Sequence, residues 1–242
     1  MKMLATALAA ALVLSGAAHA QPKPAEKPQY GGALSVANVY YTISPLTFDS
    51  ADMAWKMNQD TGLVYEQLFV ADLSKAKSKG GKYPLISDSF LPPESLKGEL
   101  AEKWELKPNP WRLEVQLRKG IMWPAKPGIM AARELTADDV VYSFDRVNKS
   151  PKKIPNYWDH VSRIEVTGKH SFTMHFSSYN AEWDYRWGWG YYSAIVPKEV
   201  MEAGAKDWKN VSGTGPYALT NYVQGNAMTF TKNPAYWDSE TI

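Results

Sequence analysis

The chain has 242 residues, of which 45% are hydrophobic and 13% aromatic, so it can bury a core and is expected to hold one or two folded domains. Its 27 basic and 25 acidic residues leave a net charge of +2, which argues against nucleic acid or an anionic membrane surface as a partner. It contains no cysteine, which excludes disulfides, thiolate catalysis, cysteine-bound zinc and lipid attachment to cysteine.

Residues 1–20 have the pattern of an export signal. A positive n-region with Lys2 precedes an apolar run over residues 4–14, and Ala18 and Ala20 supply the small side chains that a signal peptidase reads. The run is too short for the roughly 20 residues that span a bilayer. We therefore expect cleavage before Gln21, a periplasmic location, and a loose proline-rich leader over residues 21–30.

The first folded elements are expected to begin at Gly31. The apolar residues Leu34 and Val36, with Val39 after them, indicate a short strand, followed by an aromatic loop over residues 40–45. Residues 53–69 carry apolar side chains at near-helical spacing, which predicts a helix with a weak point at Gly62.

The middle of the chain alternates between strand and helix patterns. Residues 111–117 alternate apolar and charged side chains and predict a strand with one buried face. Thr136 and Asp139 form a capping box that begins a helix, so the adjacent Asp138 and Asp139 are interpreted as capping groups and not as a catalytic pair. A hairpin over residues 164–176 and a second strand pair over residues 217–230 complete a mixed α/β (α+β) fold.

The sequence offers no pattern for catalysis, a metal or a cofactor. His170 and His175 fall on opposite faces of an alternating strand, and His160 stands alone, where a hydrogen-bonded structural role is expected. There is no nucleophile elbow or His-Glu-x-x-His motif, and the glycine-rich residues 213–216 lack the lysine of a phosphate-binding loop. We predict no catalytic residues, no metal and no cofactor.

Aromatic residues are concentrated between Trp183 and Tyr192, where ten residues include six large rings. In a strand, the rings at 183, 185, 187, 189 and 191 would share one face, with glycines leaving room on the other. Such a strip suits a surface that closes on a ligand, but it equally describes the inner face of a sheet. Both interpretations remain open at this point.

Six segments, taken together and in order, resemble family 5 of the extracellular solute-binding proteins, the oligopeptide and dipeptide group. They are GGALSVA (31–37), LAEKWE (100–105), LRKGIMW (117–123), LTADDVVYSF (135–144), GTGPY (213–217) and NPAYW (233–237). Residues 124–134 depart from the family pattern, which has a shorter turn there, and this longer loop is expected to mark a subgroup.

The resemblance implies a two-lobed binding protein with a hinge. On that template, residues 31–48 and 180–242 belong to the first lobe, and residues 49–179 form a subdomain inserted into it. Family members are much longer, so we interpret the sequence as an N-terminal fragment without the second lobe.

The resemblance also implies a function. An open form would capture a solute between the lobes, and the closed form would dock as a monomer on a membrane permease driven by an ATPase. A peptide is the expected ligand, with sugar oligomers as an alternative. The site is expected to comprise Tyr40, Tyr41 and Ser44 on the first loop, together with Trp187, Trp189 and Tyr191 on the aromatic strip.

Two other classes compete with a binding protein. An exported carbohydrate-active enzyme would need two carboxylates facing each other across a cleft, about 5 to 10 Å apart. A structural periplasmic adaptor would lack a cleft of ligand size.

Overall fold

The computed structural model describes residues 31–37, 47–52, 61–85, 91–190 and 192–239, and the chain divides into two units between Ala37 and Asn38. The predicted export signal and leader, the first-loop residues Tyr40, Tyr41 and Ser44, and Tyr191 lie outside the described residues. Within the described ranges, no helix combines the length and apolar character needed to cross a membrane.

Residues 31–37, in the first unit, are not a strand. Leu34 is 89% exposed and Val36 is 74% exposed, and no described segment pairs with them. The expectation of a strand here is wrong, because alternating apolar side chains form a strand only where a partner completes the hydrogen-bond ladder.

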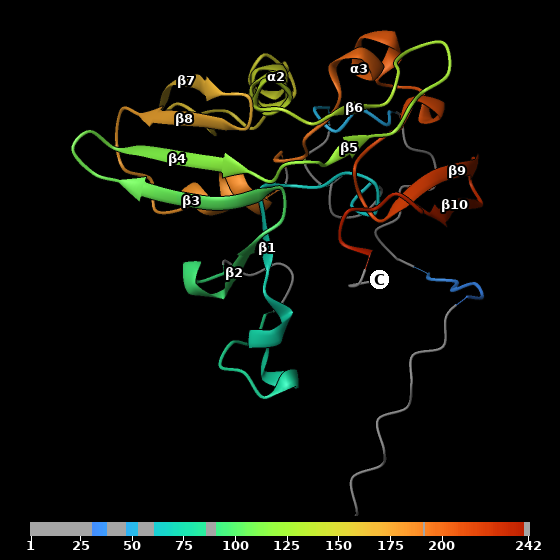
Figure 1. Ribbon diagram of the computed structural model, residues 1–242, viewed down its shortest axis with the longest axis horizontal. Coiled ribbons are helices and arrows are strands. Elements are labelled where there is room, and N and C mark those ends of the chain that lie inside the picture. Colours follow the sequence, from blue (N-terminus) through green and yellow to red (C-terminus); the bar gives the residue numbers. More distant parts are fainter. Residues whose placement is uncertain (1–30, 38–46, 53–60, 86–90, 191, 240–242) are drawn as a thin grey trace, which may run out of the picture. The chain divides into compact units, whose positions relative to one another are not determined.

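The centre of the second unit is an antiparallel sheet of four strands, in the order β3-β4-β8-β7 (Figure 1). The strands are β3 (Ala101–Lys107), β4 (Arg112–Leu117), β7 (Val161–Gly168) and β8 (Ser171–Phe176). Strand β4 pairs with β3 on one side and β8 on the other, which confirms the strand predicted from the alternation.

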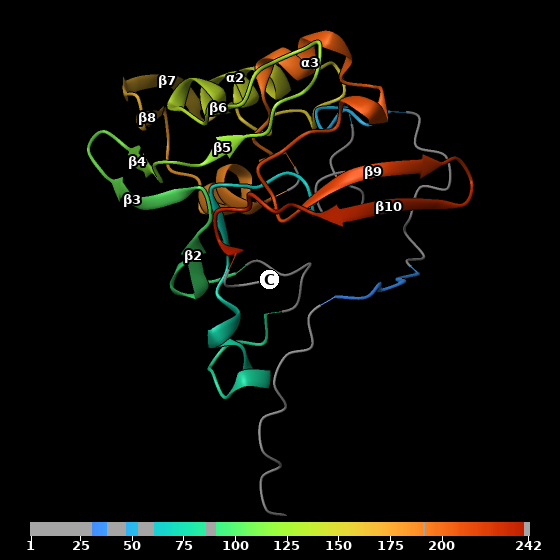
Figure 2. The ribbon, with the colours of Figure 1, turned by 45° about the vertical axis from the view of Figure 1, so that its right-hand side comes forward.

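One face of this sheet is covered by helix α2 (Ala137–Asn148), which Figures 1 and 2 show beside β7. Leu113, Val115 and Leu117 of β4 are buried on that face, together with Phe144 of the helix. Burying each such side chain contributes about 1.5–3 kcal/mol. The predicted start of α2 is confirmed, since the Asp139 carboxylate accepts the Thr136 N–H at 2.9 Å.

Short elements connect to the sheet. Among the described residues, three two-stranded antiparallel sheets pair β1 (Phe69–Ala71) with β2 (Leu96–Gly98), β5 (Met122–Trp123) with β6 (Arg133–Glu134), and β9 (Tyr217–Val223) with β10 (Ala227–Lys232). The other helical elements are η1 (Leu73–Lys75), η2 (Lys77–Lys79), η3 (Pro93–Ser95), η4 (Tyr185–Trp189), α3 (Lys198–Gly204) and η5 (Trp208–Asn210). The hairpin predicted at residues 217–230 is confirmed.

The helix predicted over residues 53–69 is wrong for its second half, and its first half lies outside the described residues. The Val64 carbonyl accepts the N–H of Gly215, and the Leu68 carbonyl accepts the N–H groups of Glu99 and Ala101. These backbone groups therefore bond to distant segments and not to the next turn of a helix.

The strand pattern of the aromatic strip is also wrong for residues 183–190, while Tyr191 lies outside the described residues. The segment forms the π-helical turn η4, closed by a hydrogen bond of 2.7 Å from the Gly190 N–H to the Tyr185 carbonyl. Gly188 lies against the ring of Phe69, where a β-carbon would overlap the ring. The close contact at Gly188 and the hydrogen bond between residues five apart stabilise this turn. The backbone here is therefore helical and does not have the extended conformation of a strand.

Candidate functional site

The aromatic residues predicted to bind ligand are separated by the π-helical turn. Trp187 is buried, with 2% of its surface exposed, whereas Trp189 is partly buried and packs edge-on against Tyr185 at 4.7 Å. Side chains two positions apart on a helix point to different sides, so these rings do not share one face as the strand pattern predicted.

Trp187 belongs to an aromatic cluster in the core. It stacks on Trp158 with ring centroids 4.6 Å apart and meets Phe144 edge-on at 4.9 Å. Its indole N–H donates to Nε2 of His160 at 3.1 Å. Burial, and secondarily the charge of Arg186, lowers the pKa of His160 and favours the neutral ring that accepts this bond. The structural role predicted for His160 is thus confirmed.

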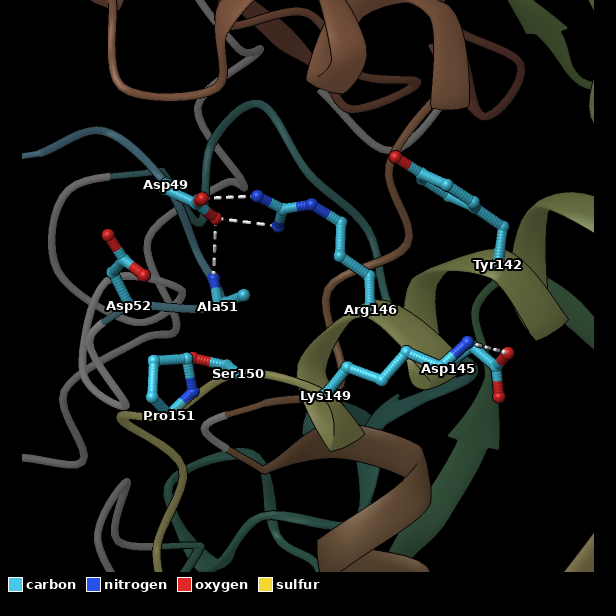
Figure 3. Close-up of a pocket in the computed structure, with 9 residues that line it drawn as sticks. All are labelled: Asp49, Ala51, Asp52, Tyr142, Asp145, Arg146, Lys149, Ser150 and Pro151. Carbon is cyan, nitrogen blue, oxygen red and sulfur yellow. Dashed lines mark hydrogen bonds and ion pairs between the residues drawn. The ribbon is translucent and has the colours of Figure 1, made fainter.

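A hollow of about 420 Å³ lies at the C-terminal end of helix α2 (Figure 3). Its walls come from residues 49–52 and from the last turns of α2 with the chain that follows. The lining residues are Asp49, Ala51, Asp52, Tyr142, Asp145, Arg146, Lys149, Ser150 and Pro151. Its volume falls in the range of small-molecule pockets.

An ion pair holds the two walls of this hollow together. The Arg146 guanidinium donates two hydrogen bonds to the Asp49 carboxylate, as Figure 3 shows, and Asp49 also accepts the Ala51 N–H at 2.9 Å. The Asp49 side chain is only 8% exposed. Because a buried carboxylate that loses its partner typically costs about 3–5 kcal/mol, the pair fixes residues 49–51 against the helix.

The remaining charges of the hollow are also paired, and both signs are present. Asp145 binds Lys149 at 2.9 Å, and Asp52 lies 3.5 Å from Lys152. Groups of three or more candidate metal ligands are absent from the part of the chain that the structure describes. With ammonium and carboxylate groups at its rim, the hollow is suited to bind a ligand that carries charge of either sign.

Sequence reasoning missed this hollow because its two walls are far apart in the chain. Asp49 and Arg146 are separated by 97 residues. The sequence near Arg146 offers one local signal. Arg146 is next to Val147 in the apolar stripe of α2, and an arginine that is partly buried there needs an acidic partner.

A second charged cluster lies at the N-terminal end of α2. Arg133 donates to Asp139 at 2.7 and 2.9 Å and to Glu199 of α3 at 2.6 and 2.7 Å. Asp139 accepts a further hydrogen bond from the Trp123 indole at 3.1 Å. The capping interpretation of Asp139 is confirmed. The loop at residues 124–134 positions Arg133 so that it pairs with Asp139 of α2 and with Glu199 of α3.

Two more carboxyls, the buried Glu66 and the partly buried Glu99, lie close to one another. The residue Glu66 is 1% exposed, and its carboxylate accepts the Trp237 indole N–H at 2.8 and 3.0 Å. Burial raises the pKa of Glu66 to about 7. Neither carboxyl lines the hollow at the end of α2.

The sequence profile described as "Bacterial extracellular solute-binding proteins, family 5 Middle" matches residues 95–241, which is more than half of the chain. A relative from Agrobacterium fabrum, "Probable peptide-binding protein YejA", is 25% identical over 230 residues, covering 88% of this chain and 32% of the relative. The chain spans about a third or less of the length of the curated relatives that it matches.

Solved structures share the fold. The periplasmic binding protein DppA from Helicobacter pylori, in complex with the peptide STSA, aligns with a TM-score of 0.60 at 22% identity over 79% of this chain and 38% of that one. A periplasmic oligopeptide-binding protein from Thermotoga maritima, bound to mannohexaose, aligns with a TM-score of 0.57 at 25% identity over 81% and 33%. The fold is therefore a mixed α/β portion of a periplasmic binding protein.

Proposed function

The chain belongs to family 5 of the bacterial extracellular solute-binding proteins, and on that premise we propose that it serves an ABC importer as a solute-capturing component and not as an enzyme. The family match over residues 95–241 is the observation that carries this proposal. In the complete protein, the solute is held between two lobes, and hinge closure presents the loaded form to a permease in the inner membrane.

A peptide is the proposed ligand. The Agrobacterium fabrum relative is described as a probable peptide-binding protein, and the Helicobacter pylori structure contains a peptide. A short peptide carries an amine and a carboxylate, and the hollow at the end of α2 has charged groups of both signs. A sugar oligomer is the second candidate, because the Thermotoga maritima protein binds mannohexaose.

The lobe boundaries remain those of the family template. Residues 31–48 and 180–242 would form the first lobe, with residues 49–179 inserted in it. On this division, the bond from Arg133 to Glu199 joins the inserted subdomain to the first lobe, as a rigid half of a hinged protein requires.

Export and assembly complete the proposal. Residues 1–20 act as a cleaved signal, the mature protein begins at Gln21 in the periplasm, and it works as a monomer. N-terminal sequencing of the exported protein tests this directly, and retention of Met1 would contradict it.

The ligand is tested by native mass spectrometry of the protein purified from its own host, followed by calorimetric titration with the peptide or sugar that co-purifies. Replacing Asp52 or Lys149 by Ala removes one charged group from the rim of the hollow. Loss of a charge-assisted hydrogen bond is worth about 1.5–3 kcal/mol, so the dissociation constant should rise by about tenfold or more.

Lys77→Ala in η2 is the matched control, because this lysine is exposed and does not line the hollow. Its affinity should equal that of the unmodified protein. If a mannooligosaccharide co-purified, the sugar and not the peptide would be assigned as the ligand. Turnover of any bound oligomer would overturn the assignment to transport.

A further inference from the structure

Glu66 and Glu99 are brought together by backbone pairing between two chain segments. The Glu99 carboxylate accepts the N–H of Gln67 at 2.7 Å, and the Leu100 N–H donates to the Gln67 carbonyl at 3.0 Å. The carboxyl of Glu99 thus lies on the peptide group that directly follows Glu66.

Among the described residues, the hydrogen-bond partners of the Glu66 side chain are uncharged. Besides the Trp237 indole, the hydroxyl of Tyr236 donates to Oε1 at 3.3 Å. Uncharged donors compensate a buried carboxylate less completely than a cation does.

The charged groups that face this pair come from three places in the described chain. Arg118 directs its guanidinium to the carbonyls of Glu99 at 2.7 Å and Gly98 at 3.3 Å and lies 4.8 Å from the centre of the Trp237 ring. The charge of Lys97 in β2 lowers the pKa of Glu99, but its effect is smaller than that of burial and of the Glu66 charge, which raise it. The charge of Asp238 raises the pKa of Glu66. Across the described ranges, no ion pair reaches either carboxyl, with Tyr236 the remaining titratable neighbour.

We propose that Glu66 and Glu99 form a proton-binding carboxyl pair that controls how tightly the Tyr236–Trp237 segment is held against the chain leading into β1. Glu66 is 1% exposed, and the neighbouring carboxyl of Glu99 disfavours a second negative charge. The closed arrangement, in which Tyr236 and Trp237 contact Glu66, therefore favours a proton on Glu66. Lifting Tyr236 and Trp237 would let water reach Glu66, and this open arrangement is favoured when Glu66 is ionised.

The direction with pH follows from the change at Glu66. Burial raises its pKa from 4.5 to about 7 in the closed arrangement, and burial also raises the pKa of Glu99, with the charge of Glu66 adding to the effect. A raised pKa means that the closed form is most stable below pH 4.5 and loses stability as pH rises toward 7. Opening should therefore increase by up to about tenfold per pH unit across that window and level off above it.

The test uses the nuclear magnetic resonance signals of the Trp237 indole N–H and of the Glu66 carboxyl carbon in the isotope-labelled chain. The Trp237 signal is assigned by its loss in Trp237→Phe. Protection of this N–H from hydrogen exchange, relative to free tryptophan, should fall by about tenfold per pH unit between pH 5 and 7. In Glu66→Gln, which mimics the protonated group, the protection should stay constant over the same range.

The carboxyl carbon of Glu66 provides an independent measurement. It should titrate near pH 7, and in Trp237→Phe its midpoint should rise, because the indole hydrogen bond lowers the pKa. Glu94→Gln in η3, an exposed glutamate, is the matched control and should leave both signals unchanged. A Glu66 midpoint near 4.5, or a Trp237 protection that does not change between pH 5 and 7, would overturn the proposal.

Discussion

Replacing Trp187 by Ala distinguishes a core residue from a ligand-binding one. The side chain is 2% exposed, stacks on Trp158 at 4.6 Å, and donates its N–H to His160. Removing a buried tryptophan ring costs about 3–5 kcal/mol through lost burial and the cavity that remains. The acceptor nitrogen left unpaired on His160 adds about 1 kcal/mol or more.

The sum, about 4–6 kcal/mol, is a large part of the 5–15 kcal/mol that stabilises a typical domain. At about 2–4 °C per kcal/mol for a chain of this size, the melting temperature should fall by roughly 10–20 °C. Differential scanning calorimetry measures the shift, and circular dichroism in the aromatic region follows the loss of the ring cluster.

Two further substitutions provide the comparison. Trp187→Phe keeps part of the packing but loses the N–H and one ring of the indole, so a smaller loss of about 1–3 kcal/mol is expected. Leu73→Ala, at a residue that is 65% exposed, should change stability by no more than about 0.5 kcal/mol. If Trp187→Ala had the same melting temperature as the unmodified protein but bound ligand more weakly, the ring would belong to a binding surface. That result would refute the assignment of Trp187 to the core.

Arg133→Met should lower the free energy of unfolding by about 3–5 kcal/mol in urea titrations, because Asp139 is 4% exposed and would remain charged without its cation. The double variant Arg133→Met/Asp139→Asn should lose less stability than the sum of the two single variants. If the two losses in free energy of unfolding simply added, the ion pair would be unimportant. Gly213→Ala should cost at least about 1–3 kcal/mol in thermal melts, since its β-carbon would overlap the backbone carbonyl of Val64, which cannot move aside. Gly168→Ala is the control, because its β-carbon meets only the Ser171 hydroxyl; equal losses at both positions would contradict the overlap argument.

Local patterns predicted the elements that local forces determine. The alternation around Leu113 and Val115 identified β4, and the Thr136–Asp139 box identified the start of α2, because both signals act within a few residues. Such patterns gave the wrong structure for residues 61–69 and 183–190. There the backbone bonds to distant partners or closes a π turn, and neither leaves a periodic trace in the sequence.

The candidate site could be predicted only in part for a related reason. The sequence predicted Trp187 and Trp189 as ligand-binding residues on one face of a strand, but they lie on a helical turn that directs Trp187 into the core. The pairing of Asp49 with Arg146 joins segments 97 residues apart, and no spacing within a single sequence encodes such a contact.

The contact between Glu66 and Trp237 bears on how the chain folds as it is synthesised. The two residues are 171 positions apart, so at about 5–20 residues per second Glu66 leaves the ribosome roughly 10–30 s before its indole donor exists. Until then, Glu66 lacks the indole donor that it has in the folded chain, so burying its carboxylate would be costly. For a chain that is exported, as proposed above, this delay would favour an unfolded state during passage through a membrane channel.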